Sequence, residues 1–155
     1  MHDVVLEWMV PYYPSMKKQL VKSLLFSSIL VFTADAILFY PVFFLLVLVL
    51  AVTAFFLLRS WRYEFEYSYV NGDLEISKII RKAKRKELYR CDRKDMTTVT
   101  KGRLAAGSRR VRDFTSGLKR ADVYTIETGE ECIYVEPNEG FLEEMKLYRK
   151  VRQAD

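Results

Sequence analysis

The side chains with the clearest chemical potential are the basic ones that follow residue 77. Residues 78–120 contain 16 lysines and arginines and four acidic residues, whereas residues 121–155 contain four basic and nine acidic residues. Clustered cationic side chains attract anionic lipid headgroups. We expect lipid contact from a turn between strands and from a weakly patterned loop, with these members: Lys82, Lys84, Arg85, Lys86, Arg109, Arg110 and Arg112.

This basic block has two other interpretations. The block could be a solvated surface balanced by the acidic C-terminal part, or an extension of the positive charge that flanks a membrane segment. Nucleic acid is a poorer partner, because only Tyr89 and Phe114 offer aromatic stacking within the block, and no recognition-helix or ribonucleoprotein motif is present. We therefore expect no nucleic-acid partner.

Groups that support catalysis or metal binding are few. His2 is the only histidine and Cys91 and Cys132 are the only cysteines, so no zinc site of the usual ligand spacing can be assembled. The sequence has no P-loop and no Gly-x-Ser-x-Gly motif. The glutamate pairs at 130–131 and 143–144 fall where a turn and an exposed helix face are expected. We expect no enzymatic activity, no cofactor and no metal.

The element that must position the basic block is a long apolar stretch, residues 20–58. About 20 residues cross a bilayer, so two helices fit this stretch better than one. We predict spans at residues 18–34 and 36–58, with Asp35 at the turn as the N-cap of the second helix. A turn at residues 39–41 is the alternative, but it leaves Asp35 inside the membrane at a cost of several kcal/mol.

Basic residues lie only at the outer ends of these two spans: Lys17, Lys18, Lys22, Arg59 and Arg62. The positive-inside rule therefore places both termini in the cytoplasm of a two-span cell-membrane protein. A buried hairpin in a soluble helical core is the alternative, but residues 43–58 carry no charge. Residues 1–17, with Trp8, Tyr12 and Tyr13, are interpreted as a segment lying on the inner leaflet. The other possibility is an irregular leader before the first helix.

After the spans the sequence changes to the period of two that is typical of half-buried strands. Aromatic and polar residues alternate over residues 62–70, and Asn71-Gly72 predicts a tight hairpin. In that register Tyr69 faces Leu74 and Tyr67 faces Ile76. Phe65 faces Lys78, where we expect a bulge, the end of the buried face or a lysine that extends to solvent.

Further short strands are predicted downstream. We place them at residues 88–91, 96–100 and 110–115, and a second hairpin at 122–128 and 132–136. Asn138 is the expected N-cap of a final amphipathic helix. Its apolar face comprises Phe141, Leu142, Met145, Tyr148 and Val151.

This order resembles the small two-span proteins of Gram-positive bacteria that carry a cytoplasmic PH-like domain of unknown function. The similarity rests on residues 67–76, 78–80, 84–86 and 136–139, while residues 101–120 depart most from the pattern. The resemblance implies an α+β membrane protein in which a transmembrane hairpin precedes a PH-like antiparallel barrel or sandwich closed by a C-terminal helix. It implies no activity.

We expect an interfacial segment at 1–17, a hairpin at 18–61 and a PH-like domain at 62–155. The predicted function is docking on lipid or on a protein at the membrane surface. The alternative is a small subunit or regulator of a larger membrane complex, with the hairpin as the partner surface. Small residues in the spans would favour the latter: Ser27, Ser28, Ala51 and Thr53.

Overall fold

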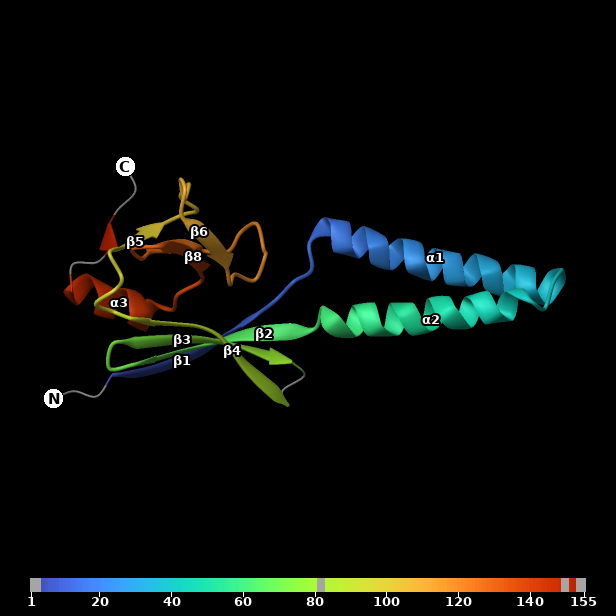
Figure 1. Ribbon diagram of the computed structural model, residues 1–155, viewed down its shortest axis with the longest axis horizontal. Helices are drawn as coiled ribbons and strands as arrows, with labels where there is room; N and C mark the ends of the chain where they lie inside the picture. The colour runs from blue at the N-terminus through green and yellow to red at the C-terminus, as the bar shows by residue number, and fades with distance from the viewer. Residues whose placement is uncertain (1–3, 81–82, 149–150, 153–155) are drawn as a thin grey trace. The chain divides into compact units, whose positions relative to one another are not determined.

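The protein folds into two compact units, and one of them is inserted into the other. The computed structural model describes residues 4–80, 83–148 and 151–152. The helical unit spans residues 14–62, and the sheet unit combines residues 1–13 with residues 63–155 (Figure 1). The expected continuous domain at 62–155 is therefore incomplete, because its first strand precedes the hairpin in sequence.

The helical unit is a hairpin of α1 (Met16–Leu38) and α2 (Phe43–Ser60). Both helices are long and apolar enough to cross a membrane. Ala36 and Ala54 are buried in it, and small side chains allow two helices to approach closely. The Thr33 and Thr53 hydroxyls donate to the carbonyl oxygens of the residues four positions earlier, at 2.6 and 2.8 Å, so neither is left unsatisfied.

The turn between the helices lies later than we predicted. Asp35 is in the last turn of α1, and its backbone oxygen accepts hydrogen bonds from the amides of Phe39 and Tyr40 at 2.9 and 3.1 Å. Pro41 lacks an amide hydrogen and disfavours the helical conformation at Tyr40, so the helix ends just before it. The interpretation of Asp35 as an N-cap is wrong, and the alternative turn at 39–41 is close to the observed one.

A four-stranded sheet forms one layer of the sheet unit. Its order is β1 (Val5–Pro11), β2 (Tyr63–Val70), β3 (Asp73–Ile80) and β4 (Lys84–Asp92), all antiparallel. The segment 1–17 was expected to lie on the membrane, but residues 5–11 pair with residues 64–70 of β2 instead. Core-facing and solvent-facing side chains alternate along this segment, as in a half-buried strand. Trp8 and Val10 pack on the core, while Met9, between them, is 56% exposed.

The β2–β3 hairpin forms in the predicted register. Asn71 and Gly72 have φ values of 51° and 112°, the positive values that this turn requires. Tyr69 pairs with Leu74 and Tyr67 with Ile76, as the alternation predicted. Phe65 also pairs with Lys78, without a bulge. The Lys78 ammonium instead lies 3.7 Å from the centroid of the Tyr63 ring.

The second layer is a five-stranded sheet in the order β6, β8, β7, β5, β9. The strands are β5 (Thr98–Lys101), β6 (Arg110–Asp113), β7 (Tyr124–Glu127), β8 (Glu131–Val135) and β9 (Val151–Arg152). The β7–β8 hairpin confirms the prediction, while β6 pairs with β8 and β5 with β9 in parallel. Within the described residues no strand pair joins the two sheets, so the predicted sandwich is found and a closed barrel is not.

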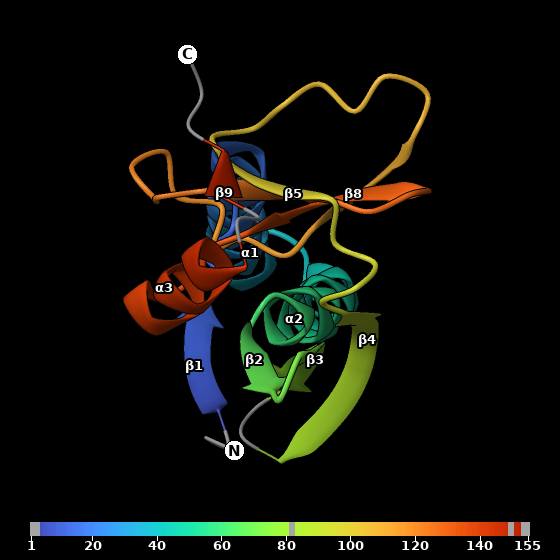
Figure 2. The same cartoon turned by 90° about the vertical axis from the view of Figure 1, so that its left-hand side faces the viewer.

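Helix α3 (Glu139–Leu147) lies between the two sheets beside β1 (Figure 2). Asn138 is its N-cap as predicted, and the Asn138 side-chain oxygen accepts from the amide of Phe141 at 2.8 Å. Phe141 and Met145 are buried in the core with Tyr67. The helix is shorter than predicted, because residues 151–152 form β9 rather than a further helical turn.

Candidate functional site

Both connections to the helical hairpin leave the four-stranded sheet at the same end. There the Tyr12 amide donates to the Tyr63 carbonyl oxygen at 3.1 Å, and the two rings stack with centroids 4.4 Å apart. Ile80 pairs with Tyr63 on one side and with Lys84 on the other, so the β3–β4 turn lies at this end too. We call this end of the sheet, with residues 12–13, 63, 78–80 and 83–86, the root.

The first group of predicted lipid contacts lies at the root. Lys84 and Lys86 are exposed on β4, whereas Arg85 forms ion pairs with Glu66 at 3.1 Å and with Glu75 at 3.0 Å. Lys86 is directly opposite Lys78, and like charges in such a pair repel each other. Lys82 lies outside the described residues. Among the described members of this group, Lys84 and Lys86 are therefore the exposed cations without an ion pair.

The second predicted group is largely occupied by internal ion pairs. Arg109 contacts Glu127 at 2.7 Å, and Arg112 contacts Glu131 at 3.0 Å. Arg112 also donates to the Leu88 carbonyl oxygen at 3.2 Å, which ties β6 to β4. The Arg110 side chain is 74% exposed and lies 4.0 Å from Glu131. Arg110 is therefore the member of this group most open to an external anion.

A third basic segment at the root was missed by the sequence analysis. Residues 114–116 are buried, and residues 117–120 that follow are all exposed. The Tyr13 amide donates to the Ser116 carbonyl oxygen at 2.8 Å, and the Ser116 amide and hydroxyl both donate to the Glu136 carboxylate at 2.7 Å. These bonds hold an exposed Leu-Lys-Arg tip, residues 118–120, next to residues 12–13 at the root.

This tip, which we call the root loop (residues 117–120), has the composition of a membrane-contacting loop. Leu118 is 49% exposed, and Lys119 and Arg120 are exposed beside it. No ion pair within the described residues involves either cation. An apolar side chain flanked by free cations suits the boundary between lipid headgroups and acyl chains.

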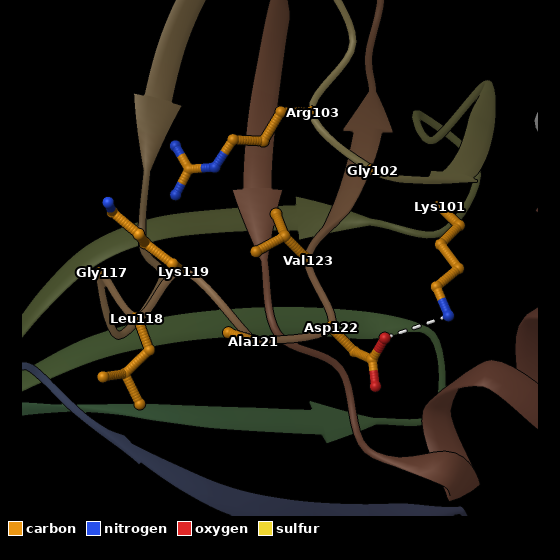
Figure 3. Close-up of a pocket in the computed structure, with 9 residues that line it drawn as sticks. All are labelled: Lys101, Gly102, Arg103, Gly117, Leu118, Lys119, Ala121, Asp122 and Val123. Atoms are coloured by element: carbon orange, nitrogen blue, oxygen red, sulfur yellow. Dashed lines mark ion pairs between the residues drawn. The ribbon is translucent and has the colours of Figure 1, made fainter.

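A groove of about 490 Å³ lies between the root loop and the end of β5 (Figure 3). Its cations are mostly neutralised, since Lys101 lies 3.0 Å from Asp122, and Arg103 lies 2.6 Å from Asp113 and 2.8 Å from the Thr115 hydroxyl. These contacts stiffen the walls of the groove. Lys119 is the lining cation without such a partner among the described residues.

The Asp113 carboxylate accepts hydrogen bonds from Thr115, just before the root loop. The stability of the sheet unit should therefore be sensitive to acid. Burial raises the pKa of Asp113, but hydrogen bonds from the Thr115 side chain and backbone and from Arg103 outweigh burial and hold the pKa below its usual value. The ionised Asp113 carboxylate therefore stabilises the folded state above the pKa that this group has in the unfolded chain, about 3.9. This stabilisation is lost as the pH falls through the lower pKa of Asp113 in the folded state.

We expect Asp113→Asn to destabilise the sheet unit at pH 7 and to cost progressively less as the pH approaches 3. Urea unfolding at each pH measures the difference from the parent protein. Asp122→Asn is the control, because the Asp122 side chain is 79% exposed. A difference that stays constant with pH would show that the Asp113 carboxylate is not the group responsible.

Among the described residues, no group of three or more His, Cys, Asp or Glu side chains is arranged to hold a metal ion. Cys91 and Cys132 are separate, buried free thiols.

Comparison with protein families gives one match that covers almost the whole chain. The sequence model of a family described as a bacterial PH-like domain (DUF6106) matches residues 2–153. No match was found among curated proteins or among solved structures. The matched region includes β1 and the helical hairpin as well as the residues after it, so the inserted arrangement belongs to the matched unit as a whole.

Proposed function

We propose a function for this chain, which belongs to the bacterial PH-like family DUF6106. It is a non-enzymatic module anchored in the membrane by its hairpin. Its sheet unit docks on the anionic surface of the same membrane. The observation that carries this proposal is the insertion of the hairpin between two neighbouring strands. Only residues 12–15 separate β1 from α1, and only Trp61 and Arg62 separate α2 from β2. The root is thereby tethered at two adjacent points.

Short tethers make weak contacts effective. An extended chain spans at most about 3.6 Å per residue, so the two-residue link keeps Tyr63 within roughly 11 Å of the end of α2. That distance is close to the range over which charges act at physiological salt, about 8 Å. Tethering also raises the local concentration of headgroups, so weak sites can be occupied.

The side of the membrane follows from the charges that flank the hairpin. All its basic residues lie at the open end, whereas the turn at residues 39–42 has none. By the positive-inside rule, we propose that both termini and the sheet unit are cytoplasmic. The inner leaflet carries anionic lipids, and each lysine or arginine near it contributes about 1 kcal/mol. Lys84, Lys86, Lys119 and Arg120 are the cations that we assign to this contact.

Docking can be tested on the full-length protein in lipid nanodiscs. Leu118→Cys would carry an environment-sensitive fluorophore, and lipids with brominated acyl chains would quench it on contact. The two native cysteines are buried, so labelling should favour position 118. We expect quenching in discs that contain phosphatidylglycerol and much weaker quenching in pure phosphatidylcholine.

The matched variants reverse two charges each. Lys84→Glu with Lys119→Glu should lower the quenching in anionic discs severalfold. Lys94→Glu with Lys146→Glu changes net charge equally at exposed positions outside the root and should leave quenching unchanged. Equal quenching in all discs and variants would reject docking. A stoichiometric protein recovered with the native protein in mild detergent would instead favour the alternative role as a subunit of a larger complex.

A further inference from the structure

Asp35 lies within the apolar part of the hairpin, because the turn forms after it. It is three residues before the end of α1, and the turn at residues 39–42 follows (Figure 1). Residues 23–58 contain no other charged side chain. A carboxylate at this position is costly if the hairpin crosses a bilayer and nothing neutralises the charge.

The length of α1 sets the depth of Asp35 in such a bilayer. An α-helix rises about 1.5 Å per residue, so Asp35 is about 20 Å along the axis from Lys22, the last basic residue before it. Lys17, the first basic residue of α1, is about 27 Å away. The hydrocarbon core is about 30 Å thick. Asp35 is therefore inside the core whichever of these lysines marks the headgroup boundary.

The turn itself favours the membrane over water. A short apolar stretch can thin the bilayer around it, which would bring Asp35 to the surface. However, Phe39, Tyr40 and Val42 of the turn are exposed, and such side chains prefer acyl chains or the membrane interface. In a helix each Cα–Cβ bond tilts toward the N-terminus, so the Asp35 side chain leans away from the turn. Its short side chain is thus directed into the apolar layer.

The hairpin supplies no counter-charge for this carboxylate. Among the described residues, the Asp35 side chain forms no hydrogen bond or ion pair, since it is the backbone oxygen that accepts from the amides of Phe39 and Tyr40. On α2 the basic residue is Arg59, about 24 Å along the axis from Phe43 at the turn. Ionisable side chains within membrane segments are usually paired. A counter-charge can therefore come only from another molecule.

The face of α1 beside Asp35 is open to a further helix. Ser27, Val31 and Ala34 are exposed and lie on one face at spacings of three or four residues. Small side chains such as serine and alanine allow a second helix to approach closely. Ala36, two residues after Ala34 and so on the opposite side of α1, is buried inside the hairpin. The open face is thus not the one that packs on α2.

We propose that this face of α1 docks a transmembrane helix of another membrane protein, and that a lysine or arginine of that helix pairs with Asp35. Complementary charge identifies the occupant as a different protein. A second copy of this chain would bring only another Asp35 to the same depth, and two carboxylates repel each other. The site requires that the hairpin cross the bilayer, as in the proposed function, but it does not require the sheet unit to dock.

The test places the full-length protein in phosphatidylcholine vesicles with a synthetic transmembrane peptide. The peptide has about 22 leucines and alanines and one arginine a single turn from one end. Val42→Cys would carry a donor fluorophore at the turn, since the two native cysteines are buried, and the peptide would carry an acceptor near its arginine. We expect energy transfer. The apparent dissociation constant should rise about tenfold for Asp35→Asn, or for a peptide with leucine in place of arginine.

Two further variants separate charge from structure. Thr33→Val is the matched control, because Thr33 is a polar neighbour whose hydroxyl already donates to the Ile29 carbonyl oxygen at 2.6 Å, and association should be unchanged. Asp35→Lys should lose the arginine peptide and gain a peptide that carries glutamate, which a damaged hairpin would not do.

Three outcomes would overturn the proposal. The leucine peptide could associate as strongly as the arginine peptide, Asp35→Asn could leave association unchanged, or two labelled copies of the protein could associate through Asp35 without any peptide. The vesicles contain no anionic lipid, and none of these outcomes depends on quenching at position 118. Docking of the sheet unit can therefore fail while this site stands, and the reverse also holds.

Discussion

A fragment that begins at Arg62 is expected to remain unfolded, whereas a chain in which a short turn replaces residues 14–62 is expected to fold as a soluble domain. The first product lacks β1, which pairs with β2 over seven residues. The second retains it, and the hydrogen bond between the Tyr12 amide and the Tyr63 carbonyl oxygen marks a point where the strands can be joined. A linker of about four residues rich in glycine and asparagine is the usual length for such a connection.

The expected effect is large because β1 covers the most deeply buried part of the core. Tyr67, Tyr69 and Phe141 have at most 1% of their surface exposed, and Trp8 of β1 packs on Tyr67 and Phe141. Removal of the strand would expose these rings and leave β2 as a bare sheet edge, which favours aggregation. A domain of this size is stable by only about 5–15 kcal/mol, and the loss of several large contacts is of the same order.

Circular dichroism and the dispersion of amide signals in a ¹H–¹⁵N spectrum would measure folding of the two products. The bridged chain should give dispersed signals and a cooperative urea transition, and the fragment should give neither. A bridged chain that also lacks residues 4–11 controls for the linker and should behave like the fragment. Cooperative unfolding of the fragment alone would contradict the role assigned to β1.

Sequence reasoning succeeded where the signals were local. The alternation over β2 and β3 with Asn71-Gly72 between them specified their register, and Asn138 marked the start of α3, because these features depend on neighbours a few residues away. Strand β1 was missed because its partner lies beyond the hairpin, more than 50 residues away, and because Pro11 and Pro14 are poor strand formers. An edge strand tolerates proline at its end, and the alternation of Leu6, Trp8 and Val10 was the local signal that could have identified β1.

The candidate site was predicted in part, for a similar reason. The excess of basic residues was visible in the sequence, but their partners were not. Glu75, Glu127 and Glu131 come from other strands and form ion pairs with Arg85, Arg109 and Arg112. The root loop was missed because its place at the root follows from long-range hydrogen bonds, from Tyr13 to Ser116 and from Ser116 to Glu136. Net charge could be counted from the sequence, whereas which charges remain exposed required the fold.

Trp8→Ala is expected to lower the free energy of unfolding of the sheet unit by about 3 kcal/mol, near the lower end for truncation of a large aromatic side chain because Trp8 is only partly buried. The Trp8 ring stacks on Tyr67 with centroids 4.9 Å apart and lies 5.7 Å from the ring of Phe141. Its indole N–H donates to the Glu136 carbonyl oxygen at 2.9 Å. One side chain therefore joins β1 to β2 and to α3, and its loss weakens both contacts.

Urea unfolding of the bridged domain, followed by circular dichroism, measures this loss. Met9→Ala is the matched control, because Met9 is the next residue of the same strand and points away from the core, and it should change stability by no more than about 0.5 kcal/mol. Trp8→Phe should fall between the two, since it keeps a stacking ring but loses the N–H donor. On a half-buried strand, substitutions at two neighbouring positions should change the free energy of unfolding by very different amounts. On a membrane-bound segment, substitutions at both positions would leave the stability of the soluble domain unaffected. Equal effects at positions 8 and 9 would therefore contradict the assignment of residues 5–11 to the sheet. They would favour the interpretation that the first residues lie on the membrane surface.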